Sequence, residues 1–73
     1  MNFATMNDTR RTLTDRELDI LNLVAGGKTS AQIADILSLS EETIRWYRKR
    51  LLVKFEAKNT AGLVRKAIME KII

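Results

Sequence analysis

The chain of 73 residues contains no cysteine, no histidine and no proline. Without cysteine or histidine it can form neither disulfides nor the usual zinc sites, and it lacks the nucleophile–base pairs that use these residues. The carboxylates of Asp15, Glu17, Asp19 and Asp35 are assigned instead to helix caps and solvated faces. We therefore expect a protein that is not an enzyme and that needs no cofactor and no metal ion.

Long hydrophobic runs are also missing. No apolar run approaches the ~20 residues that a membrane-spanning helix needs, so no membrane partner is expected. The lack of cysteine suits the reducing cytoplasm, which is the expected location. The absence of proline and the many Leu, Ile, Ala, Lys, Arg and Glu residues favour helices. Because a chain below ~80 residues has only a thin core, we expect one all-α domain that depends on close helix packing or on a partner subunit.

The positive charge is unevenly distributed along the chain. The net charge is +4, yet residues 13–40 carry −2, while residues 41–55 carry +3 and hold five of the thirteen Lys and Arg residues. An asymmetry of this kind is typical of a surface that binds a polyanion. A solvated Lys/Arg surface would also explain a modest net charge, so the motifs around the basic segment decide between the two.

Four segments begin with helix-start signals and continue with apolar residues at helical spacing. Thr14–Glu17 and Thr29–Gln32 have the pattern of capping boxes, Ser40 is a third N-cap, and Asn59 or Thr60 can be the fourth. The expected helices run from Thr14 to the Gly26-Gly27 pair, and over about residues 30–37, 41–55 and 60–71.

The apolar residues of these segments predict a core made from one face of each helix. The expected inward positions are Leu18, Ile20, Leu21, Val24, Ala25, Ile33, Ala34, Ile36, Leu37, Ile44, Tyr47, Leu51 and Phe55, and the apolar positions of the fourth helix are Leu63, Val64, Ala67, Ile68 and Ile72. Residues 1–12 are polar and aperiodic, and we expect them to be a flexible N-terminal arm before one folded domain, residues 13–73.

Residues 29–55 have the pattern of a short helix, a tight turn and a longer basic helix. Two helices joined in this way place the second helix in the major groove of DNA. The outer face of the longer helix carries Arg45, Trp46 and Lys49. Trp46 is a large aromatic residue on a cationic face. It either packs against a neighbouring helix or, as we favour, is exposed and contacts thymine methyl groups or sugars.

The sequence resembles the LuxR/GerE-type helix-turn-helix family over about residues 13–68. The resemblance depends on the joint spacing of Leu13–Glu17, Ala25–Thr29, Gln32–Ala34, Leu39-Ser40, Thr43–Arg45, Leu51, Lys54-Phe55 and Asn59. It implies a four-helix, sequence-specific bacterial transcription regulator that binds double-stranded DNA as a homodimer. In that family the third helix enters the major groove and the fourth makes the dimer contact. The resemblance also admits RNA polymerase as a partner.

The resemblance assigns roles to single residues. The basic base-reading position of the family falls on Arg45, the next groove-facing position on Trp46, and a second basic contact on Lys49. Phosphate contacts are implied for Thr29, at the start of the second helix, and for Thr43, at the start of the recognition helix.

Further site residues follow from position on the helices. Arg48, Arg50 and Lys54 flank the outer face and are expected to contact phosphates or to steer the domain toward them. The fourth helix has more apolar circumference than one core-facing stripe needs, which predicts a homodimer contact there. We expect either Val64 or Ile68 to be exposed in the monomer and to face the partner.

Three positions depart from the family pattern. Tyr47 stands where the family usually has His, Trp46 where it often has Val or Thr, and Asn59-Thr60 where it has Asn-Arg. Together these departures predict a different target sequence and leave DNA binding intact.

Two other functions fit parts of the pattern. A sigma-factor-like promoter-recognition module has a similar architecture, but the capping boxes and the Gly-Gly pair favour the LuxR type. A protein-interaction domain that has lost DNA binding would not need the cations at positions 45, 48, 49 and 50. The chain length fits either a complete small regulator or the effector end of a longer response regulator or ligand-sensing protein, whose N-terminal part would gate dimerisation.

Overall fold

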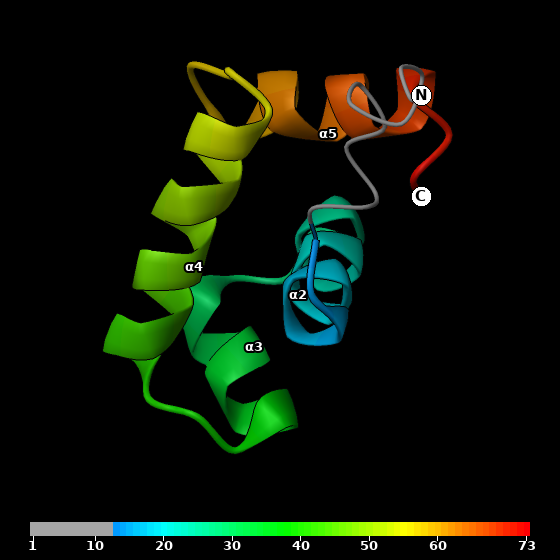
Figure 1. Ribbon diagram of the computed structural model, residues 1–73. Helices are drawn as coiled ribbons and strands as arrows, with labels where there is room; N and C mark the ends of the chain where they lie inside the picture. The colour runs from blue at the N-terminus through cyan, green and yellow to red at the C-terminus, as the bar shows by residue number, and fades with distance from the viewer. Residues whose placement is uncertain (1–12) are drawn as a thin grey trace.

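The computed structural model describes residues 13–73, which form four α-helices and no strand (Figure 1). With the labels of Figure 1 these are α2 (Asp15–Ala25), α3 (Ser30–Leu37), α4 (Glu41–Lys54) and α5 (Thr60–Met69). The predicted all-α class is confirmed. The predicted flexible arm, residues 1–12, lies outside the described residues.

Helix α4 is the longest and contacts each of the other three helices. Its N-terminal part lies near α3, while α5 crosses beyond its C-terminal end and α2 lies between α3 and α5 (Figure 1). One side of α4 therefore faces the core, and the other side is left without a neighbouring helix among residues 13–73. This arrangement determines which residues of α4 can reach a ligand.

The helices begin where the predicted caps are. Thr14 and Thr29 each form a complete capping box, in which the hydroxyl accepts from the N3 amide at 3.1 Å and the N3 side chain accepts from the cap amide at 2.9 Å. Ser40 Oγ accepts from the Thr43 amide at 3.0 Å. Asn59, and not Thr60, caps α5, because its Oδ1 accepts from the Gly62 amide at 2.8 Å. The four predicted starts are confirmed.

All four described helices end with the same backbone geometry, which the sequence indicates only at the Gly26-Gly27 pair. Each helix is followed by a residue in the left-handed region, and the next amide donates to the carbonyl five residues earlier, which satisfies an otherwise orphaned acceptor. The left-handed residues are Gly27, Ser38, Glu56 and Lys71, with φ of 88°, 58°, 53° and 60°. Because Lys71 adopts this conformation, α5 ends at Met69, earlier than the predicted residue 71.

The core contains most of the expected residues. Those buried are Ile20, Leu21, Val24, Ile33, Ala34, Ile44, Leu51, Phe55, Leu63 and Ala67, and Leu37, Tyr47, Val64 and Ile72 pack against them half-buried. Leu18 is also half-buried. The expected burial of Ala25 and Ile36 is wrong, because both are exposed. The inward stripe of α3 is centred between Ile33 and Leu37, so Ile36 lies to one side of it.

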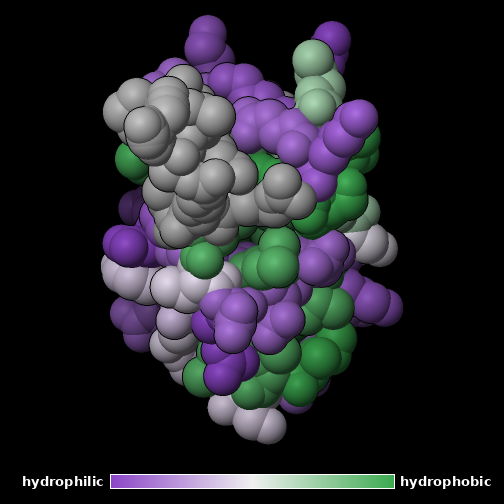
Figure 2. Space-filling model, turned by 45° about the vertical axis from the view of Figure 1, so that its right-hand side comes forward, coloured by the Kyte–Doolittle hydropathy of each residue, from purple (hydrophilic) through white to green (hydrophobic). Residues whose placement is uncertain are grey.

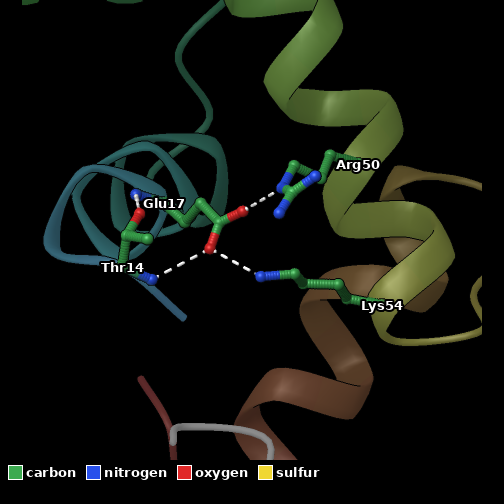
Figure 3. Close-up of polar contacts among 4 residues, drawn as sticks. All are labelled: Thr14, Glu17, Arg50 and Lys54. Atoms are coloured by element: carbon green, nitrogen blue, oxygen red, sulfur yellow. Dashed lines mark hydrogen bonds and ion pairs between the residues drawn. The ribbon is translucent and has the colours of Figure 1, made fainter. Parts of the chain in front are cut away.

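Glu17 is the buried charged residue of the described chain, with 1% of its surface exposed. Its Oε2 accepts from Arg50 Nε at 2.6 Å, and its Oε1 accepts from Lys54 Nζ at 2.8 Å and from the Thr14 amide at 2.9 Å (Figure 3). The predicted cap is confirmed, but the predicted solvated position of Glu17 is wrong. The carboxylate joins the start of α2 to the C-terminal half of α4.

The surroundings of Glu17 favour its charged form. Burial by itself raises the pKa of the carboxyl group, but hydrogen bonds from Lys54, from the Thr14 amide and from Arg50 outweigh that effect and lower the pKa from 4.5 to about 2. Removing one partner from such a buried cluster leaves an uncompensated charge and destabilises the fold strongly.

Glu17→Gln should therefore lower the free energy of unfolding at neutral pH by about 3 kcal/mol, since glutamine keeps the capping oxygen and loses the charge. A group whose pKa falls on folding stabilises the fold above its unfolded pKa. This contribution is lost as the pH falls from about 5 toward the folded pKa of about 2. Urea unfolding of both proteins at several pH values in this range measures the difference, which should shrink with falling pH.

Asp19→Asn is the matched control for this experiment. It removes an exposed carboxylate from the same helix and should change the stability by less than about 0.5 kcal/mol. If the stability difference between wild type and Glu17→Gln stayed constant between about pH 6 and about pH 2, this result would contradict the assigned role of the carboxylate charge.

Candidate nucleic-acid interface

Helix α4 has one apolar face and one polar face. Ile44 and Leu51 are fully buried on the inner face. Arg45, Trp46 and Lys49 are exposed on the outer face, as the sequence predicted. Because a helix turn brings residues four positions apart together, Arg45 and Lys49 lie one above the other. The outer face of α4 is thus a cationic surface with an aromatic side chain in it.

Trp46 is exposed over 55% of its surface. Of the two interpretations of this residue, packing inside the domain is wrong for the described chain. Its ring meets the ring of Tyr47 edge to face, with centroids 5.0 Å apart and planes at 78°. The guanidinium of Arg50 lies over the Trp46 ring at 5.4 Å, within the range of a cation–π contact. Both of these ring contacts come from residues of α4 itself.

Two shallow hollows flank Trp46 and Lys49 on the surface. The first lies between the start of α3 and the outer face of α4, and the second lies further along α4 toward its C-terminal end. Seven of the eight predicted DNA-contacting residues line these two hollows. The first is lined by Thr29, Arg45, Trp46, Arg48 and Lys49, and the second by Trp46, Lys49, Arg50 and Lys54. Thr43 lines neither of these two hollows.

The two predicted threonines lie at helix N-termini. Thr29 caps α3 and is exposed. Thr43 lies in the first turn of α4, where its Oγ1 accepts from Ser40 Oγ at 2.8 Å. Backbone amides and the helix dipole make such N-termini favourable for anions. Both residues are therefore placed where a phosphate group could be held.

The cations of α4 have different surroundings. Arg45 pairs with Glu41 at 2.6 Å, but the two side chains are 60% and 48% exposed, so the pair is weak and can open for a ligand. Arg48 donates from Nη2 to Thr60 Oγ1 at 3.1 Å, and its Nη1 is buried without a hydrogen-bond partner among the described residues. Arg48 also lines the first hollow.

Arg50 and Lys54 differ from the other cations because both bind Glu17. The Arg50 side chain is 47% exposed and the Lys54 side chain only 19%. Sequence reasoning placed both at the interface and missed their partner. The residues are 33 and 37 positions from Glu17, and no periodicity connects residues so far apart in the chain.

Helix α5 also exposes apolar residues. Ile68 and Met69 are 56% and 68% exposed, whereas Val64 is half-buried against the core. Of the two predicted dimer positions, Ile68 is thus the exposed one. Figure 2 shows hydrophobic side chains, in green, reaching the surface among hydrophilic ones, in purple.

Residues 13–73 contain neither a metal-binding cluster nor a membrane-spanning helix. In this part of the chain no group of His, Cys, Asp and Glu is placed to hold a metal ion. No helix within it has the length and hydropathy needed to cross a membrane.

Comparison with known proteins identifies the family. The family model of the bacterial regulatory proteins of the luxR family matches residues 11–67. The chain is 39% identical over 61 residues to the transcriptional regulatory protein MctR of Rhizobium johnstonii, a match that covers 84% of this chain and 28% of MctR. It is 49% identical over 47 residues to the transcriptional regulatory protein DesR of Bacillus subtilis, covering 64% of this chain and 24% of DesR.

A third relative is the quorum-sensing regulator RhlR of Pseudomonas aeruginosa, 47% identical over 47 residues, or 64% of this chain and 20% of RhlR. The chain therefore spans about a quarter of the length of the curated relatives it matches. The family consists of DNA-binding regulators and not of enzymes. The chain belongs to the luxR family of bacterial regulatory proteins, and its four helices form the DNA-binding helix-turn-helix domain of that family.

Proposed function

We propose that the domain recognises a specific DNA sequence as a homodimer, with α4 in the major groove. The observation that carries this proposal is the outer face of α4, where Arg45, Trp46 and Lys49 are exposed together beside Thr29. An α-helix fits the major groove, and there the base edges present distinct hydrogen-bonding patterns. Binding to the chromosome would place the protein in the cytoplasm.

Two groups of residues carry different parts of the binding. Arg45 and Lys49 read base edges, because they are exposed one turn apart on the face opposite Ile44 and Leu51. Thr29, Thr43 and Arg48 hold phosphates at the rim, where the N-termini of α3 and α4 supply donors and Arg48, which lines the first hollow, supplies positive charge. Opening of the exposed Glu41–Arg45 pair frees Arg45 for the bases.

Arg50 and Lys54 act mainly inside the domain. Their bonds to Glu17 hold α4 at a defined position on α2, and hence fix how far the recognition helix projects. Arg50, which is almost half exposed, can also reach a phosphate. Lys54 is the less exposed of the two, and its contribution to DNA binding is the steering effect of its charge.

The homodimer is formed through α5. Ile68 and Met69 provide an exposed apolar strip, and a two-fold interface pairs such a strip with itself. The strip is short, so the dimer is weak in solution and is strengthened on DNA, where two recognition helices bind half-sites about one helical turn apart. RNA polymerase is a further partner of the DNA-bound dimer.

The function is tested by titrating duplex DNA with the protein at several salt concentrations. Each phosphate contact should lower the logarithm of the affinity by about 0.9 per unit of log salt concentration, because neutralised phosphates release counterions. Binding that is absent, or that is insensitive to salt, would contradict the proposal and favour a protein-interaction domain.

Arg45→Ala should flatten the binding-site profile at one base position. Loss of a bidentate contact to a base edge should cost about 1–3 kcal/mol for the preferred duplex and much less for others. Selection of bound sites from random duplexes, with wild type and variant in parallel, measures this change. Arg16→Ala, an exposed arginine on α2, is the charge-matched control. An equal loss of affinity on all duplexes would assign Arg45 to phosphate instead.

Trp46→Ala should weaken specific DNA binding and leave the stability of the free domain within about 0.5 kcal/mol of wild type, because the ring is exposed. The comparison variant is Phe55→Ala, which empties a buried site and should cost about 3–5 kcal/mol. Thermal melts and DNA titrations of both variants separate the two effects. A stability loss for Trp46→Ala as large as that for Phe55→Ala would remove Trp46 from the interface.

Ile68→Glu should abolish dimeric occupancy of a duplex with two half-sites while leaving the circular dichroism spectrum and binding to a single half-site intact. Val64→Glu should instead destabilise the domain, because it places a charge against the core. Asn22→Glu adds the same charge at an exposed position of α2 and controls for repulsion from DNA. Dimeric occupancy unchanged by Ile68→Glu would show that the dimer is built elsewhere.

A further inference from the structure

Arg50 connects the buried carboxylate to the exposed aromatic residue of α4. Its Nε donates to Glu17 Oε2 at 2.6 Å, while its guanidinium carbon lies 5.4 Å from the centroid of the Trp46 ring. Glu17 is in turn held by the Thr14 amide and by Lys54 (Figure 3). The Arg50 guanidinium is therefore fixed by the buried Glu17 and lies over the solvent-exposed ring of Trp46.

The Trp46 ring is restrained on a second side as well. The Tyr47 ring meets it at 5.0 Å and 78°, and Tyr47 is itself half-buried against the core. An exposed tryptophan normally samples several side-chain rotamers. With Arg50 over it and Tyr47 beside it, the ring is held in one orientation before any ligand arrives, which reduces the entropy lost on binding.

The surface next to the ring is suited to a small apolar group among anions. The second hollow is lined by Trp46, Lys49, Arg50, Val53 and Lys54, and Val53 is 77% exposed. The positive charges around it match the phosphates of DNA. The thymine methyl is the apolar group that base pairs present in the major groove.

We propose that Trp46 selects a thymine at one position of the target site by contact with its methyl group, and that Glu17 and Arg50 are positioning residues for the Trp46 ring. This inference rests on the proposed function, because it requires α4 to lie in the major groove. It assigns to Glu17, a residue of α2 with no exposed surface to offer DNA, an effect on which base is preferred.

The positioning role requires arginine and not only a positive charge. The guanidinium is planar, donates from Nε to Glu17 and stacks on an aromatic face, whereas a lysine ammonium is a compact, hydrated charge. Arg50→Lys therefore keeps the attraction to phosphates and removes the support of the ring. Glu17→Gln removes the charge that fixes the guanidinium and keeps the capping oxygen.

The experiment uses the 73-residue chain and the duplex obtained by site selection. Each thymine of the preferred site is replaced in turn by uracil, which differs only by the missing methyl. For wild type, replacement at one position should weaken binding about fourfold, the factor that corresponds to one buried methyl-sized group. With Trp46→Ala, Arg50→Lys or Glu17→Gln, the same replacement should have little effect. The salt dependence with Arg50→Lys should match that of wild type.

A spectroscopic measurement on the free protein reports the ring directly, because Trp46 is the single tryptophan of the chain. Arg50→Lys and Glu17→Gln should both increase acrylamide quenching of its fluorescence and weaken its near-ultraviolet circular dichroism. Lys54→Met is the matched control, since it removes the other cation that binds Glu17 and leaves the Arg50 contact with the ring in place. It should lower stability while leaving the tryptophan signals and the uracil effect near those of wild type.

The outcomes separate this inference from the function beneath it. Salt-dependent, sequence-specific binding with no thymine that responds to uracil would overturn the inference alone. A uracil effect that persists in Arg50→Lys would also overturn it, and so would one that is lost to the same extent in Lys54→Met. Either result would mean that the Glu17 cluster only stabilises the fold and does not position the Trp46 ring. Absence of salt-dependent binding to any duplex would overturn both proposals.

Discussion

The ion cluster of Glu17 with Arg50 and Lys54 is the interaction on which the geometry of the interface depends. A carboxylate with 1% exposure is tolerated only because three donors replace its water, two of them from α4. Apolar contacts between α2 and α4 bury surface but do little to fix the orientation of one helix on the other. Hydrogen bonds to both carboxylate oxygens are directional, and they fix this orientation. Helix α4 is thus held at a fixed position and rotation on the rest of the domain.

Several of the cations of α4 are paired with carboxylates of the domain itself. Of the five cations of α4, Arg50 and Lys54 are paired with Glu17 and Arg45 with Glu41. The uncompensated charge of α4 is therefore smaller than the number of its Lys and Arg residues suggests. In the proposed complex the buried Glu17 cluster would persist, because breaking it would leave an uncompensated charge in the core, while the exposed Arg45 could exchange Glu41 for a base. One helix contains both structural and ligand-directed cations.

The exposed apolar residues follow the same division. Trp46 at the outer face and Ile68 on α5 are large hydrophobic side chains, yet both are exposed and contribute little to the small core of this domain. A small domain that leaves such residues in water forgoes burial energy. Both exposures are understandable if DNA covers one of the residues and a second copy of the chain covers the other.

Local signals in the sequence determined the helix starts, because a capping residue acts within three positions of its partner, as at Thr14, Thr29, Ser40 and Asn59. Helical spacing also determined which face of α4 carries Arg45, Trp46 and Lys49. Tertiary structure alone decided the rest: the left-handed ends at Ser38, Glu56 and Lys71, the exposure of Ile36 and Ile68, and above all the partner of Arg50 and Lys54. Periodicity identifies a face, but only the packing of α2 against α4 brings Glu17 to cations more than thirty residues away, and with them determines which charges remain for DNA.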